Sequence, residues 1–312
     1  MKNTTVKFWF ILFCAFTVTI NAQKVDTTLV AAQPKVKTFK LDSKLMARQM
    51  PYNVILPADY ENEKTVRYPV IYILHGLGGD YKSLGRSFGD NSQFLEYAAK
   101  HRFIIVTPEG GTGFYTDSAT EPDNRYESYF IQELIPEIDR NFRSITERRG
   151  RAVAGASMGG YGALKYGVKY PQMFVLAASW SGAVNVASWR NEEQLLSIPF
   201  AKTIPGIKQI LFPVFGDGTK PTLQENDLFK IFKEVSQEKI AGLPFFYLDC
   251  GTEDQLQLLE PNRQLAEILL NRKIPHQYRH FPGDHRLQAW LITDFLSLSE
   301  RIFAFQKSAS NK

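Results

Sequence analysis

The stretch Gly155-Ala156-Ser157-Met158-Gly159 decides the fold, because it lies between a short apolar run at 151–154 and a helix-like segment at 160–166. Strand, G-x-S-x-G and helix in this order is the context of a serine held in a sharp strand-to-helix turn. The strained backbone of such a turn requires neighbours without side chains, which the two glycines supply. The Ser157 hydroxyl would lie at a helix N-terminus, where backbone N–H groups favour negative charge. A chance match is the alternative, and the flanking segments favour a nucleophilic serine.

Length and composition indicate a globular enzyme of one large α/β domain or two small ones. The chain has 312 residues, of which 44% are hydrophobic and 22% are charged. Its formal net charge of +5 falls to +3 once Lys2 and Lys7 are removed with the N-terminal segment. A charge this small and evenly spread argues against a nucleic-acid partner.

The N-terminus has the pattern of a secretory signal peptide over residues 1–22. Lys2 and Lys7 flank the start of a mostly apolar run at 8–20, and a cleavage site follows at Ala22. The run is shorter than the roughly 20 residues that a membrane-spanning helix needs. We therefore predict an exported protein, secreted or periplasmic, without stable membrane insertion.

The cysteines agree with this prediction. A lipid anchor on Cys14 is an alternative to cleavage, but the bulky Phe13 before it fits a lipid-attachment motif poorly. Cleavage after the signal peptide would leave Cys250 as the single cysteine, so an intramolecular disulfide could not form. We expect Cys250 to be a small buried residue at a strand end.

Strand-like and helix-like segments alternate along the rest of the chain. Apolar or alternating runs predict strands at 36–41, 50–56, 68–74, 103–106, 152–154, 174–178, 245–248 and 277–281. Helical patterns fall at 93–100, 130–142, 158–170, 260–271 and 287–305. The alternation predicts an α/β fold with a mostly parallel central sheet, helices on both faces and antiparallel strands at the leading edge.

We predict a single domain over 36–306, preceded by a leader at 23–35 and followed by a short tail at 307–312. Residues 183–239 interrupt the alternation and contain several prolines. We interpret this stretch as a small cap-like insertion rather than as a second domain.

A serine hydroxyl needs a base, and the base needs an orienting partner. Three histidines follow Ser157 in the chain: His276, His280 and His285. His285 is favoured because it follows Pro282-Gly283-Asp284, in a loop at the carboxyl edge of the sheet where such sites assemble. The other two belong to a strand-like run.

The orienting acid is expected in the loop after the preceding strand. Asp249, Glu253 and Asp254 are the candidates there. Asp249 is still in the register of the strand, whereas Asp254 follows the turn at Gly251 and is free to reach the histidine. We favour Asp254 and interpret Glu253 as a surface residue.

Two backbone N–H groups are needed to stabilise the oxyanion that forms when a serine attacks a carbonyl group. One should belong to Met158, directly after the serine. The other should come from the loop His75-Gly76-Leu77-Gly78-Gly79, which follows an apolar strand and whose glycines let backbone approach a ligand closely. We expect His75 to shape this loop.

Five stretches in this order form a specific pattern. They are Pro51-Tyr52-Asn53-Val54-Ile55-Leu56-Pro57, the loop at 75–79, the turn at 155–160, Asp249-Cys250-Gly251-Thr252-Glu253-Asp254 and Pro282-Gly283-Asp284-His285. The pattern resembles the esterase D-like branch of the α/β-hydrolases, and it covers nearly the whole chain after the signal peptide. This branch includes S-formylglutathione hydrolase, tributyrin esterase, feruloyl and acetyl-xylan esterases, and the antigen 85 mycolyltransferases.

The resemblance implies roles for the residues that match. Ser157 would be the nucleophile, His285 the base and Asp254 the orienting acid, while Leu77 and Met158 would supply the oxyanion-hole amides. One departure stands beside the histidine: many members carry a Gly-His-Asp-Trp-like segment, whereas here Asp284-His285-Arg286-Leu287 precedes Trp290. The wall of the acyl or leaving-group pocket is therefore expected to differ.

The resemblance and the export signal together imply a secreted serine carboxylic-ester hydrolase. Its partner would be a small-molecule or carbohydrate ester carrying acetyl or feruloyl groups. Flat rings stack well on sugars and aryl groups, so four aromatic residues are candidates for substrate binding, with packing as their alternative role: Phe114, Tyr115, Tyr126 and Trp290. Glu109, Asp117 and Glu121 lack metal-ligand spacing, so we expect no metal and no cofactor.

Two other functions stay open at this stage. An acyltransferase of antigen 85 type would differ only in the acceptor that reaches the acyl-enzyme. A catalytically inactive hydrolase fold used for binding is the second, and the retained Ser, Asp and His in family order argue against it.

Overall fold

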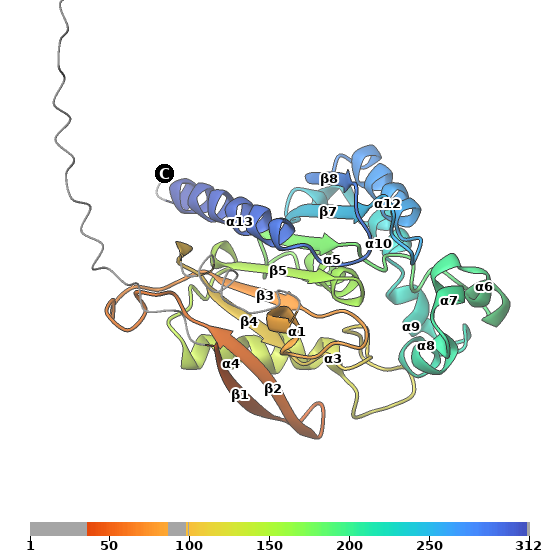
Figure 1. Ribbon diagram of the computed structural model, residues 1–312, viewed down its shortest axis with the longest axis horizontal. Coiled ribbons are helices and arrows are strands. Elements are labelled where there is room, and N and C mark those ends of the chain that lie inside the picture. Colours follow the sequence, from red (N-terminus) through yellow and green to blue (C-terminus); the bar gives the residue numbers. More distant parts are fainter. Residues whose placement is uncertain (1–35, 87–97, 99, 311–312) are drawn as a thin grey trace, which may run out of the picture. The chain divides into compact units, whose positions relative to one another are not determined.

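The computed structural model describes residues 36–86, 98 and 100–310. Their centre is an eight-stranded sheet with the strand order β1-β2-β4-β3-β5-β6-β7-β8 (Figure 1). The strands are β1 Val36–Ser43, β2 Arg48–Ile55, β3 Val70–Leu74, β4 Ile104–Pro108, β5 Arg151–Ala156, β6 Leu176–Trp180, β7 Phe245–Gly251 and β8 His276–Phe281. Each lies where an apolar or alternating run predicted one, with ends shifted by a few residues.

The sheet is mostly parallel, as predicted. β1 pairs with β2 and β2 with β4 in antiparallel register, and every pair from β4 through β3 to β8 is parallel. All residues of β3 and β4 are buried, which fits strands covered on both faces. Parallel pairing places the carboxyl ends of β3 to β8 at one edge of the sheet.

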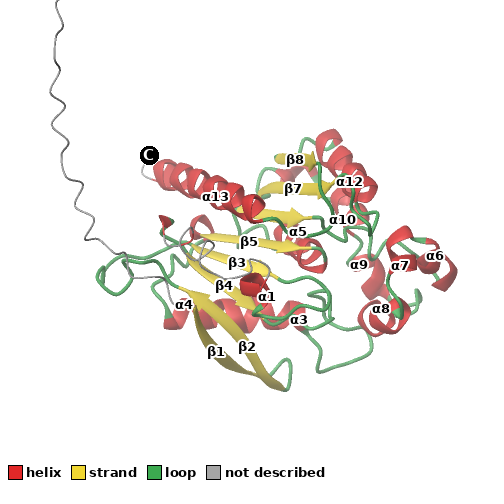
Figure 2. Cartoon of the chain, viewed as in Figure 1, coloured by secondary structure: helices red, strands yellow, loops and turns green. Residues whose placement is uncertain are grey.

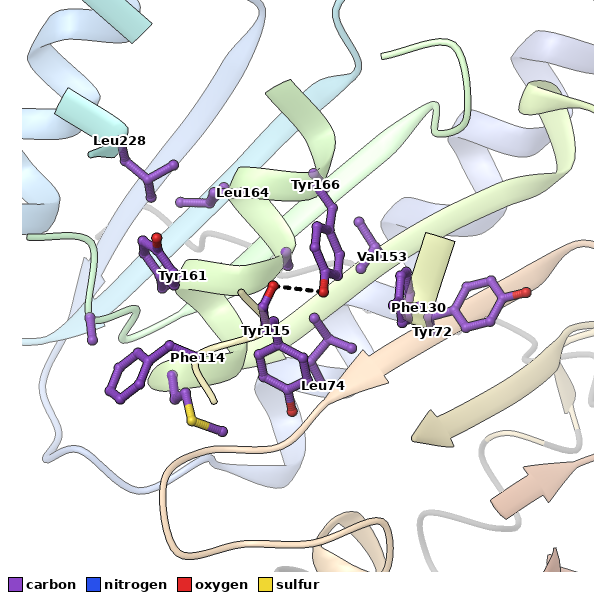
Figure 3. Packing of buried hydrophobic residues seen from close by; sticks show 14 of the residues in the cluster. Tyr72, Leu74, Phe114, Tyr115, Phe130, Val153, Tyr161, Leu164, Tyr166 and Leu228 are labelled. Carbon is purple, nitrogen blue, oxygen red and sulfur yellow. Dashed lines mark hydrogen bonds between the residues drawn. The ribbon is translucent and has the colours of Figure 1, made fainter. Parts of the chain in front are cut away.

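Helices cover both faces of the sheet, because alternate residues of each strand point to opposite sides (Figure 2). Tyr72 and Leu74 of β3 pack in one core with α5 (Met158–Lys169) and α12 (Leu259–Asn271). Figure 3 shows part of this core around α5. Ile71 and Ile73 pack in a second core with α13 (Ala289–Ser310).

The helix predicted at 130–142 has a different start. The chain forms a short α3 (Tyr126–Ser128), then a π-helical turn η1 (Tyr129–Leu134), and only then α4 (Ile135–Asn141). Pro136 has no N–H to donate to the carbonyl group four residues earlier, which interrupts the regular α-helical ladder at this junction. The helix predicted at 93–100 falls mostly outside the described residues.

The stretch 183–239 consists of short helices that join the first core. They are α6 Glu192–Ser197, α7 Pro199–Thr203, α8 Ile207–Phe215, α9 Pro221–Glu225, α10 Leu228–Glu234 and α11 Gln237–Ile240. Tyr161 of α5 donates a hydrogen bond from its hydroxyl group to the carbonyl oxygen of Asn226 at 2.8 Å. The backbone N–H of Ala119 donates to Val214 at 2.9 Å. These hydrogen bonds attach the stretch 183–239 to α5 and to the loop that precedes α3.

No helix in the described part of the chain is long and apolar enough to cross a membrane. The predicted signal peptide and leader lie outside the described residues.

Candidate active site

Ser157 occupies the turn between β5 and α5 and has a strained backbone. Its φ of 55° and ψ of −115° place it outside the regions that a non-glycine residue ordinarily adopts. Hydrogen bonds hold this conformation: its N–H donates to Trp180 at 2.9 Å, and its carbonyl oxygen accepts from Ala183 at 3.1 Å. Strain that is held by the surrounding backbone is typical of a functional residue.

The glycines around Ser157 are required by close backbone contacts. A Cβ atom at Gly155 would collide with the carbonyl group of Gly159, and one at Gly159 would collide with the carbonyl group of Leu74. A Cβ atom at Gly160 would lie 2.5 Å from Ser179 Oγ. The turn can therefore pack between β3 and β6 only when these positions lack side chains, which explains the pattern in the sequence.

His285 and Asp254 form a hydrogen-bonded pair. His285 Nδ1 lies 2.8 Å from Asp254 Oδ2, with the aspartate side chain fully buried and the imidazole 16% exposed. Asp254 Oδ1 accepts a second hydrogen bond, from the N–H of Leu256 at 2.8 Å. A histidine that donates from Nδ1 to a carboxylate keeps a lone pair on Nε2, which is the arrangement of a general base.

The loops that carry this pair are joined by backbone hydrogen bonds. Thr252 donates to the carbonyl oxygen of Phe281 and Glu253 to that of Gly283, each at 2.8 Å. Gly251 allows the approach, because a Cβ atom there would lie 2.6 Å from the carbonyl oxygen of Asp284. Asp254 and His285 are therefore fixed relative to each other by main-chain hydrogen bonds as well as by their own hydrogen bond.

The other two candidate acids, Asp249 and Glu253, lie in different environments from Asp254. Asp249 is buried within β7, and its carboxylate accepts a hydrogen bond from the Tyr247 hydroxyl at 2.8 Å. Burial raises the pKa of Asp249 to about 7. Glu253 is exposed on the surface. Of the other histidines, both on β8, His276 is half-buried and His280 is exposed.

Cys250 contacts Asp254, which the sequence did not indicate. It is buried near the end of β7, as predicted, and its thiol donates to Asp254 Oδ2 at 3.5 Å. Burial, followed by the nearby Asp254 charge, raises the pKa of Cys250 to about 12, so the thiol keeps its proton. Cys250 therefore supports the same carboxylate oxygen that His285 contacts.

The loop at 75–79 runs beside the serine. A Cβ atom on Gly76 would lie 3.4 Å from Ser157 Cβ. His75 Nδ1 contacts the carbonyl oxygen of Gly76 at 2.8 Å, and His75 Nε2 accepts from the N–H of Gly110 at 2.9 Å. Because Nε2 accepts, Nδ1 carries the proton and donates. The two ring nitrogens of His75 therefore link the backbone of Gly76 to that of Gly110. Leu77 lies in this loop, and Met158 is the first residue of α5.

Topology brings the three candidate catalytic residues to one edge of the sheet. Ser157 follows β5, Asp254 follows β7 and His285 follows β8, and these strands belong to one parallel series. The carboxyl ends of parallel strands are where sites of such sheets assemble. Within the described residues no hydrogen bond joins Ser157 to His285. Such bonds are often long in proteins without substrate and tighten when it binds.

The aromatic residues named from the sequence lie in different environments. Phe114 and Tyr115 are each 2% exposed and belong to the core, and Tyr126 is also buried. Trp290 is 41% exposed and packs edge-on against Phe281, with ring centroids 5.1 Å apart. Of the four, only Trp290 presents a large area to solvent.

No group of three or more histidine, cysteine, aspartate or glutamate residues that would suit a metal ion occurs in the part of the chain that the structure describes.

Comparison with known proteins found a matching family and similar sequences. Residues 43–295 match the model of the Esterase family. An esterase of Mycobacterium tuberculosis is 32% identical over 268 residues, which cover 81% of this chain and 56% of that protein. The chain thus spans about half the length of this relative. An acetyl esterase of Caldicellulosiruptor saccharolyticus is 27% identical over 256 residues, covering 80% of this chain and 91% of that enzyme.

A solved structure of a ferulic acid esterase has a similar fold. It superposes with a TM-score of 0.69 at 28% sequence identity and covers 86% of this chain and 99% of its own. The α/β-hydrolase architecture expected from the sequence is therefore confirmed.

Proposed function

We propose, because this chain belongs to the Esterase family and has the α/β-hydrolase fold, that it hydrolyses carboxylic esters through an acyl-enzyme on Ser157. The observation that carries the proposal is the buried Asp254–His285 pair, at the same sheet edge as the strained serine. A buried carboxylate bonded to Nδ1 of a partly exposed histidine favours the tautomer that a base needs.

The proposed reaction has two stages. In the first, Ser157 Oγ attacks the ester carbonyl carbon while His285 Nε2 takes the hydroxyl proton. The tetrahedral oxyanion accepts hydrogen bonds from the N–H groups of Leu77 and Met158, and it collapses as His285 gives its proton to the leaving alcohol. In the second stage, water attacks the acyl-enzyme with His285 again as the base, which releases the acid and restores Ser157.

Asp254 orients His285 and stabilises the imidazolium that forms in both stages. Its full burial strengthens this effect, because the interaction between the two charges is little screened by solvent. Met158 N–H lies at the N-terminus of α5, where the helix dipole also favours the oxyanion.

For the substrate we propose short acyl or feruloyl esters of carbohydrates or related alcohols. Relatives named acetyl esterase and ferulic acid esterase support this class. We further propose that residues 1–22 direct the protein out of the cytoplasm, since they have the pattern of a signal peptide.

The test compares kcat/KM for p-nitrophenyl acetate and methyl ferulate, with Ser157→Ala as the control. The proposal expects turnover of at least one ester, lost in the variant while the melting temperature is kept. Preference for acetate would indicate a deacetylase with a narrow acyl pocket, and preference for ferulate an aryl subsite. Full activity in Ser157→Ala would contradict the mechanism.

A further inference from the structure

We infer that Tyr115 is a positioning residue that fixes the two halves of the oxyanion hole relative to each other. This inference rests on the proposed ester hydrolysis. One amide, Met158 N–H, belongs to helix α5, and the other, Leu77 N–H, belongs to the separate loop after β3. Two donors on different elements act together only when something holds their separation constant. Tyr115 forms hydrogen bonds with both the loop after β3 and helix α5.

The hydroxyl end of Tyr115 contacts the loop. Its Oη donates to the carbonyl oxygen of His75 at 2.9 Å, two residues before Leu77. The ring of His75 is itself held by hydrogen bonds to the carbonyl oxygen of Gly76 and from the N–H of Gly110. A shift of the Tyr115 hydroxyl group would therefore be passed directly to the backbone that carries the Leu77 amide.

The backbone end of Tyr115 contacts the nucleophile helix. Its carbonyl oxygen accepts from Lys165 Nζ at 2.8 Å and from Tyr166 Oη at 2.9 Å, and both donors belong to α5. The dashed line in Figure 3 marks the bond between Tyr166 and Tyr115. Lys165 is fully buried and paired with Glu127 at 2.7 Å, so its charge is compensated where it lies.

The local backbone is strained in a way that serves these contacts. Phe114 and Tyr115 have consecutive positive φ angles of 47° and 53°, which non-glycine residues rarely adopt. Glycines make room for the ring: a Cβ atom at Gly110 would lie 2.5 Å from it, and one at Gly162 would lie 2.7 Å from it. Strain of this kind persists only where the surroundings over-determine it. Here the bonds at both ends of Tyr115 supply that constraint.

The burial of Tyr115 favours a positioning role over stacking on substrate. Tyr115 is 2% exposed, and its hydroxyl group already has a partner, so no ligand ring can lie flat on it without displacing the core. The residue acts through His75 and α5 rather than by touching substrate.

The test uses Tyr115→Phe, which keeps the ring and removes only the bond to His75. Tyr161→Phe is the matched control. Tyr161 is also buried in the core, on α5 itself, and the variant loses a hydroxyl hydrogen bond to the backbone carbonyl oxygen of Asn226 at 2.8 Å, which is not in the oxyanion loop. Both variants are expected to lose similar stability, because each leaves one buried carbonyl group without its donor.

Only Tyr115→Phe is expected to lose catalysis, by about tenfold in kcat with KM within twofold of the wild-type value. Inhibition by phenylboronic acid, which forms a tetrahedral adduct on a serine, should weaken by a similar factor. Tyr166→Phe, which removes one donor to the Tyr115 carbonyl group, should lower kcat less. It tests the link to α5 if Tyr115→Phe does not fold.

Equal kcat values for the Tyr115→Phe and Tyr161→Phe variants would overturn the inference. A change in KM alone in Tyr115→Phe, with kcat unchanged, would also overturn it. If Tyr115→Phe does not fold, an unchanged kcat in Tyr166→Phe would overturn it. Wild type and Ser157→Ala are run in the same assay. If the wild type shows no Ser157-dependent hydrolysis, the proposed function fails and this inference fails with it. If that hydrolysis is present and the variants behave alike, only the role of Tyr115 is wrong.

Discussion

Asp254 Oδ2 lies 2.8 Å from His285 Nδ1, and the two residues come from loops that follow neighbouring parallel strands, β7 and β8. The carboxylate is fully buried and also accepts bonds from Leu256 N–H and the Cys250 thiol. An acid held by three donors has little freedom to rotate, so the histidine that it orients is held as well. The segments 249–254 and 282–285, which are distant in the sequence, therefore meet at one edge of the sheet.

Replacing Asp254 should slow catalysis without abolishing it. We expect Asp254→Asn to lower kcat by roughly 10²- to 10⁴-fold, because the amide favours the wrong histidine tautomer. The loss should be smaller than in Ser157→Ala, since in the proposed mechanism Asp254 orients the histidine and does not attack the ester. Steady-state kinetics with p-nitrophenyl acetate measures both. An Asp254→Asn enzyme with wild-type kcat would show that this carboxylate has no part in the reaction.

Replacing Asp249 should change stability rather than catalysis. Its pKa is raised by burial from 3.8 to about 7, so between these values the folded protein binds a proton that the unfolded chain has released. Stability therefore falls as the pH rises through this window, and the penalty is complete above about pH 7. Asp249→Asn should stabilise the fold at pH 8, by on the order of 2 kcal/mol, and should have much less effect near pH 4.

Thermal melts at both pH values check this prediction for Asp249. Asp294→Asn is the control, because it removes the exposed carboxylate that pairs with Arg279 at 2.9 Å. Its melting temperature should change little at either pH. If Asp249→Asn lowers kcat more than Asp254→Asn does, the assignment of the acid is wrong.

A single methyl group in the serine turn should strongly destabilise the fold. Gly159→Ala would place a Cβ atom against the carbonyl groups of Leu74 and His75, and backbone cannot yield as a flexible side chain does. We expect a destabilisation of roughly 3 kcal/mol or an insoluble product. Gly242→Ala is the control, because the nearest atom to a Cβ there is 3.6 Å away. Equal melting temperatures for the two variants would refute the packing argument.

The thiol of Cys250 should be unreactive in the folded protein. It is buried, and its pKa is raised to about 12, so almost no thiolate is present at pH 8. A chain expressed without residues 1–22 should react with Ellman's reagent only after urea is added. Rapid labelling of the native protein would mean that the carboxylate side of the site is open to solvent.

The fold could be predicted because its signals are local. Apolar runs marked the strands, and the glycines beside Ser157 marked the turn, where the structure now shows that a side chain would collide with main chain. The meeting of Asp254 with His285 followed from strand order, since loops after parallel strands share one edge.

Other features have no such local signal. The sequence leaves two roles open for Phe114 and Tyr115, stacking on substrate or packing, because an aromatic residue in a loop has the same sequence pattern whether it faces solvent or the core. Their positive φ angles are usually marked by glycine or asparagine, and neither is present. The link from Lys165 through Tyr115 to His75 joins three elements far apart in the chain, so only the folded structure brings it together.

The proposed role of Ser157 as the nucleophile can be checked by covalent labelling. The protein is treated with a fluorophosphonate probe, and the modified peptide is located by mass spectrometry in the wild type and in Ser157→Ala. We expect one modification, on Ser157, with loss of esterase activity in proportion to labelling and no label in the variant. Absence of label in the wild type, or label on another residue with activity lost, would contradict it.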